Sequence, residues 1–137
     1  MNGHMSRKSI SNFFAIPAAV FLVVIGLLHS YFNVSGGRRM MERGDLSARL
    51  GGAFIANALF SGLALSLLGL LVFLVLPGLR AGSRQAARVA IAIGTFVGVA
   101  GAAGFLWMPT KPSVLIFLFF GALLAVPCLV WRREFQG

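Results

Sequence analysis

Few polar side chains in this sequence could do chemistry, and most of them lie inside two long apolar stretches. They are His29, Ser30 and Asn33 in residues 13–34, and Asn57 and Ser61 in residues 51–76. Within each stretch the spacing of three or four positions places these side chains on one face of a helix. Polar residues inside a membrane-spanning helix commonly mark function, so this set is the first candidate site.

The depths of His29 and Asn57 in their stretches are similar. His29 precedes Val34 by five positions, about 7–8 Å along a helix, and Asn57 follows Gly51 by six positions, about 9 Å. Consecutive helices are usually antiparallel neighbours. We therefore expect His29 and Asn57 to meet near the same side of the membrane, with Trp107 as a further member of this pocket.

His29 has three interpretations. It is a hydrogen-bonded structural residue near the interface, or it binds a proton or a ligand in a pocket with Asn57, Ser61 and Trp107. The third interpretation is a metal or haem ligand, for which a partner chain would have to supply further ligands, because one histidine supplies only one. No cofactor and no metal are expected within a single chain.

The sequence gives little support for an enzyme. The stretches contain no glycine-rich phosphate loop, no His-Glu-x-x-His motif and no paired carboxylates. The nucleophiles Ser30, Ser61 and Cys128 have no recognisable base with an orienting partner. We expect Cys128 to pack in the protein interior, and no residue is assigned a catalytic role.

The composition indicates an integral membrane protein. Of 137 residues, 58 % are apolar and only 11 % are charged, which excludes a disordered chain. One cysteine excludes a disulfide scaffold and a cysteine-based zinc site. The length predicts a single membrane domain over residues 1–137, in which residues 1–5 and 134–137 resemble cloning-derived ends.

Four uncharged stretches are each long enough to cross the hydrocarbon core as a helix. They are residues 13–34, 51–76, 89–108 and 114–131. Helix breaks are expected at Ser35-Gly36-Gly37 and at Pro77-Gly78, and a tight connection at residues 109–112. The predicted fold is an all-α integral membrane protein, a bundle of four transmembrane helices with short loops.

The net charge of +9 arises from basic residues that flank the apolar stretches. They form no face with interleaved aromatic residues, so no nucleic-acid partner is expected. With four spans, seven basic residues lie on the side of the termini and five on the other, which places both termini in the cytoplasm, as in a bacterial inner membrane. Anionic lipid headgroups are the expected partners of Arg80, Arg84, Arg88, Arg132 and Arg133.

Small residues recur every four positions in two of the stretches. They are Ala58, Gly62 and Ser66 in the second stretch, and Ala90, Gly94, Gly98 and Ala102 in the third. Such grooves let helix backbones approach closely. We expect the grooves to pack helices, either within this chain or, for the third stretch in particular, against a second protomer or a partner subunit.

Three functions follow from these features. The first is a structural, accessory or oligomerising subunit of a membrane assembly, favoured by the small-residue grooves and the absence of charge inside the spans. The second is a homo-oligomeric transporter or channel for a small solute. The third is a membrane enzyme, or a binder of a lipid or quinone, that uses a polar pocket around His29.

Overall fold

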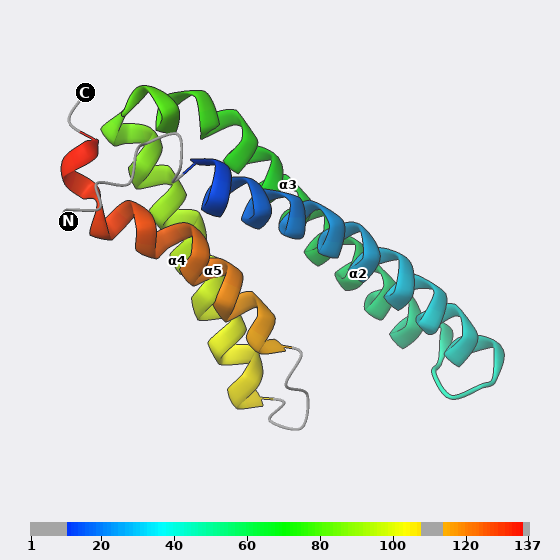
Figure 1. The fold of residues 1–137 in the computed structure, drawn as a ribbon. Coiled ribbons are helices and arrows are strands. Elements are labelled where there is room, and N and C mark those ends of the chain that lie inside the picture. Colours follow the sequence, from blue (N-terminus) through cyan, green and yellow to red (C-terminus); the bar gives the residue numbers. More distant parts are fainter. Residues whose placement is uncertain (1–10, 108–113, 136–137) are drawn as a thin grey trace. The chain divides into compact units, whose positions relative to one another are not determined.

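The structure is a computed structural model that describes residues 11–107 and 114–135, which form helices and no strand (Figure 1). The elements are a π-helical turn η1 (Ser11–Ala15), α2 (Ile16–Glu42), α3 (Ala48–Ala81), α4 (Arg84–Trp107), α5 (Leu115–Val130) and a 3-10 turn η3 (Arg132–Glu134). The predicted all-α membrane fold with four apolar helices is confirmed: α2, α3 and α4 are long and apolar enough to span a membrane, and α5 is a shorter apolar helix. The predicted connection at 109–112 and the ends 1–5 and 136–137 lie outside the described residues.

The predicted break at Ser35-Gly36-Gly37 is wrong, because α2 continues through these residues to Glu42. Gly37 is buried in contact distance of Phe54 and Ile55, so packing offsets the cost of glycine in a helix. The helix ends at Glu42, and the chain turns at Gly44, whose φ is 79° and whose N–H donates to the Met41 carbonyl at 3.0 Å.

The predicted end at Pro77-Gly78 is also wrong, since α3 includes Pro77 and runs to Ala81. Gly82, with a φ of 81°, makes the turn there, and the Ser83 N–H donates to the Gly78 carbonyl at 2.8 Å. The Ser83 hydroxyl then accepts the Ala86 N–H at 3.3 Å and caps the start of α4. Two residues, Gly82 and Ser83, therefore separate the two long helices.

The chain divides into two compact units. The first, Val20–Leu70, is a hairpin in which the central parts of α2 and α3 run antiparallel (Figure 1). A Cβ atom on Gly26 would overlap the Gly62 carbonyl oxygen, so the two backbones are in close contact. The Ser47 hydroxyl accepts the Leu50 N–H at 3.4 Å, which caps α3 at the end of the hairpin turn.

The second unit contains Met1–Ala19 and Leu71–Gly137, of which 11–19, 71–107 and 114–135 are described. Its main feature is the pair α4 and α5, which pack side by side along their length (Figure 1). Phe14 of η1 lies near Trp131 at the end of α5, with ring centroids 6.4 Å apart. Buried residues such as Ala90, Val97 and Leu124 form the interior of this unit.

Candidate functional site

Ser30 of the predicted polar site and Ser66 bind backbone carbonyls across the α2–α3 hairpin. The Ser30 hydroxyl of α2 donates to the Ala58 carbonyl of α3 at 3.4 Å, and the Ser66 hydroxyl of α3 donates to the Val23 carbonyl of α2 at 3.3 Å. The two bonds cross the interface in opposite directions. These hydroxyls therefore join the two helices, and Ser66 had been predicted only as a packing residue.

Two further members of the predicted site bond within their own helix. The Ser61 hydroxyl donates to the Ala58 carbonyl at 3.2 Å, and the Asn33 amide donates to the His29 carbonyl at 2.8 Å. Polar side chains in a membrane helix commonly satisfy themselves on the preceding turn in this way. Neither bond joins α2 to α3.

His29 and Asn57 form no hydrogen bond with each other in the described part of the chain. His29 is half-buried and Asn57 is exposed. The reason is rotation: the helices meet along Ser30 and Ala58, and each polar residue is one position away from that line. One position is about 100° around a helix, so matching depth along the axis does not bring the two side chains together.

The last member, Trp107, lies at the end of α4 in the second compact unit and is 87 % exposed. The described residues contain no group of three or more His, Cys, Asp or Glu side chains that could hold a metal ion. Cys128 is a free, buried thiol in α5, with 1 % of its surface exposed.

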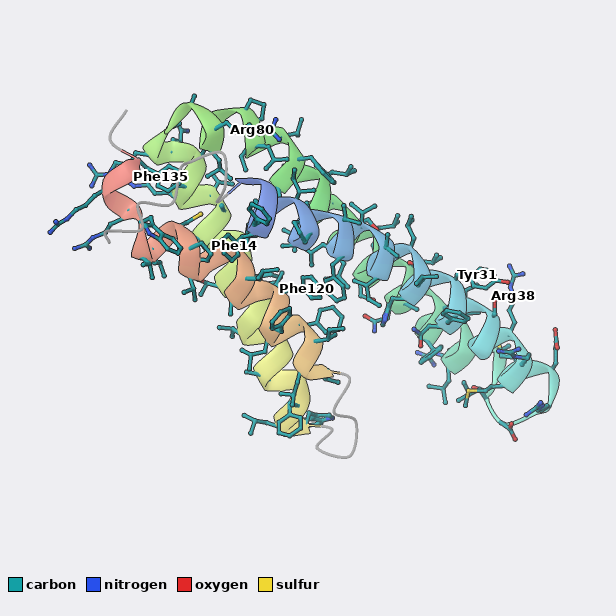
Figure 2. All side chains as sticks on the ribbon, in the orientation of Figure 1. Phe14, Tyr31, Arg38, Arg80, Phe120 and Phe135 are labelled. Atoms are coloured by element: carbon teal, nitrogen blue, oxygen red, sulfur yellow. The ribbon has the colours of Figure 1, made fainter. Side chains whose placement is uncertain are left out.

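A groove of about 350 Å³ lies on the hairpin beside the predicted site. Its lining consists of Leu27, Ser30, Tyr31, Val34, Ser35, Arg38 and Leu59. Of the predicted polar residues, only Ser30 takes part. Tyr31 and Arg38 are labelled on the outer half of α2 in Figure 2. The groove is mainly apolar and does not assemble His29, Asn57 and Ser61 into a reactive constellation.

Both predicted small-residue stripes lie in helix contacts within the chain. In the hairpin, a Cβ atom on Gly62 would overlap the Ser30 hydroxyl and the Gly26 carbonyl, and Ala58 is 4 % exposed. In the second unit, a Cβ atom on Gly94 would lie 2.6 Å from the Gly121 carbonyl oxygen of α5. The α4 stripe could pack within the chain or against a second protomer, and the contact of Gly94 with α5 is packing within the chain.

The α4 stripe is not uniformly tight. Ala90 is fully buried, whereas Ala102 is only half-buried. A Cβ atom on Gly98 would lie 3.8 Å from the nearest Leu118 side-chain atom, which is an ordinary contact distance. Glycine is therefore required by close approach at Gly94 and Gly121, and much less so at Gly98.

Replacing Ser30 or Ser66 by alanine should destabilise the hairpin modestly. Each change removes one hydrogen bond between α2 and α3, and such bonds in membranes average ~0.6 kcal/mol and reach ~1.7 kcal/mol. Unfolding titrations in mixed micelles measure the loss. Ser61→Ala is the matched control, because the Ser61 hydroxyl bonds within α3 and its removal should leave the hairpin stability unchanged.

The predicted headgroup arginines lie at the ends of α3, α4 and α5. Arg80 is exposed near the end of α3. The arginines Arg84, Arg88, Arg132 and Arg133 line one cavity in the second unit.

The comparisons with protein-family models, with curated proteins and with solved structures found no match to this chain.

Proposed function

We propose that this chain is a small structural subunit of a membrane assembly, and that it associates with a second copy of itself through the outer face of α3. The observation that carries the proposal is Asn57. Its carboxamide is exposed on a membrane-spanning helix and has no hydrogen-bond partner in the described part of the chain.

Asn57 lies well inside the uncharged part of α3. Asn57 follows Arg49, the last charged residue before it, by eight positions, which is about 12 Å along the helix axis. Beyond it α3 remains uncharged as far as Leu79. A carboxamide at that depth has few water molecules to bond, and polar side chains in such places usually bond across a helix interface.

A second copy of the chain satisfies this carboxamide directly. The side chain of asparagine both donates and accepts hydrogen bonds. Two Asn57 side chains related by a two-fold axis can therefore each donate to the other, as an isologous interface requires. In the most apolar 18-residue segment of α3, only 28 % is buried within the chain, so a second helix has surface on which to pack.

The residues around Asn57 allow close approach. Ala53 and Ala64 lie four positions before and seven positions after it on the same helical face, and both are exposed. Phe60, 76 % exposed, lies on this face between them. Small residues beside a polar one are typical of helix contacts in membranes, and the large ring supplies contact area. We name Ala53, Asn57, Phe60 and Ala64 the α3 outer face.

Two further parts of the proposal concern placement. The three long apolar helices support insertion in a membrane, for which we propose a bacterial inner membrane. The excess of basic residues on the side of the termini supports an orientation with both termini in the cytoplasm.

Asn57→Leu should weaken self-association about tenfold, because interhelical hydrogen bonds of side chains contribute up to about 1–2 kcal/mol in model membrane peptides. Energy transfer between two fluorescently labelled populations in lipid vesicles, measured over a range of protein-to-lipid ratios, gives the dissociation constant. Asn57→Gln keeps the carboxamide and should retain most of the association.

Leu63→Ala is the matched control, because Leu63 is 58 % exposed on α3 but lies off the α3 outer face. It should leave the dissociation constant unchanged. A wild-type chain that stays monomeric at every ratio contradicts the proposal, as does an Asn57→Leu variant that associates like the wild type.

A further inference from the structure

A cavity of about 510 Å³ lies in the second unit, where α4 begins and α5 ends. Its lining consists of Arg84, Ala87, Arg88, Ile91, Cys128, Leu129, Arg132, Arg133 and Phe135. Two of the arginines come from α4 and two from η3, which follows α5. The cavity is therefore built by residues far apart in the sequence.

The cavity carries an excess of positive charge, since four arginines line it and η3 contains a single acidic residue, Glu134. All four arginines are exposed, and no ion pair joins any of them to a side chain that the structure describes. Arginines brought together in excess over acidic residues attract an anion, and their planar donors suit the oxygens of a phosphate.

The floor of the same cavity is apolar. Ala87 and Cys128 are 4 % and 1 % exposed, and Ile91 and Leu129 extend the apolar surface along the helices. The uncharged part of α4 begins at Val89, immediately after Arg88, so the cavity crosses from the charged end of the helix pair to the start of its apolar surface.

We propose that this cavity, which we name the arginine cavity, binds the phosphate group of an anionic phospholipid. The arginines bind the phosphodiester at the headgroup level, and an acyl chain lies against Ile91 and Leu129. A free phosphate would use the arginines but not the apolar floor, and this floor favours the lipid. Basic pockets between membrane helices are known to bind anionic headgroups in this manner.

Native mass spectrometry of the detergent-solubilised chain with added phosphatidylglycerol tests the proposal. The wild type should retain phosphatidylglycerol at least tenfold better than phosphatidylcholine. Arg88→Gln combined with Arg132→Gln removes one arginine from each side of the cavity and should abolish this preference. The matched control is Arg39→Gln with Arg43→Gln, which removes the same charge from the hairpin and should keep the preference.

Two competitors distinguish the sources of the phosphate. Inorganic phosphate and glycerol 3-phosphate at equal concentration should not displace the lipid, because they lack the acyl chain. Displacement by either would overturn the assignment to a lipid. Undiminished retention by the Arg88 and Arg132 variant, or an equal loss in the Arg39 and Arg43 control, would overturn the arginine cavity as the site.

Discussion

Replacing Gly121 by alanine is expected to destabilise the α4–α5 pair by about 1–3 kcal/mol or more, the cost of overpacking a close contact. The added Cβ atom would lie 2.5 Å from the Gly94 carbonyl oxygen and from the Gly98 nitrogen. Both are backbone atoms in the middle of α4 and cannot rotate away, so the two helices must separate. Equilibrium unfolding in mixed micelles measures the change.

Gly98→Ala is the control for this prediction. The nearest atoms to its Cβ, in Leu118 and Gly121, lie 3.8 and 4.0 Å away, so the methyl group has room. Alanine also favours a helix over glycine by roughly 0.5–1 kcal/mol. Gly98→Ala should therefore be neutral or slightly stabilising. An equal loss of stability in the two variants would show that α4 and α5 do not make the contact described.

Gly62→Ala is expected to open the α2–α3 hairpin. Its Cβ atom would overlap the Ser30 hydroxyl and the Gly26 carbonyl oxygen, and the carbonyl belongs to the backbone of α2. We expect a loss of about 1–3 kcal/mol from overpacking, with a further loss from the broken Ser30 hydrogen bond. Hydrogen exchange of the amides in the facing parts of α2 and α3 should rise with the loss of stability.

The control on the same helix is Gly52→Ala. No heavy atom outside the glycine's own chain neighbourhood lies within 4 Å of a Cβ atom at this position. The substitution should leave the hairpin intact and raise its stability slightly through helix propensity. If Gly62→Ala proved as harmless as Gly52→Ala, the close approach of α2 and α3 would be contradicted.

The helices could be predicted from the sequence, because long uncharged stretches have one stable form in a membrane. The small residues at helix contacts could also be predicted, because they recur every four positions, as Gly62 and Ser66 do in α3 and Gly94 and Gly98 do in α4. The partner of each polar side chain was not predictable. His29 and Asn57 match in depth, yet each is rotated about 100° from the contact line, and spacing within one helix gives no information about that rotation.

The positions at which α2 and α3 end were also predicted wrongly from the sequence. Glycine and proline predict breaks by their local preferences, but α2 passes through Gly36 and Gly37 and α3 passes through Pro77. Burial of Gly37 against Phe54 and Ile55 provides a tertiary contact that the local pattern does not contain. The helices end at Glu42 and Ala81, and the chain turns just after them at Gly44 and Gly82, which have a positive φ.

The most direct test of self-association is cysteine cross-linking along α3 in vesicles, with Cys128→Ala as the background. Single cysteines at positions 53, 60 and 64 keep Asn57 and report on the α3 outer face, and cysteines at 59 and 63 report on the rest of the exposed surface. We expect cross-linked dimers at the first three positions and little at 59 and 63. Equal yields at all five positions, or the highest yield at 59 or 63, would contradict a dimer centred on Asn57.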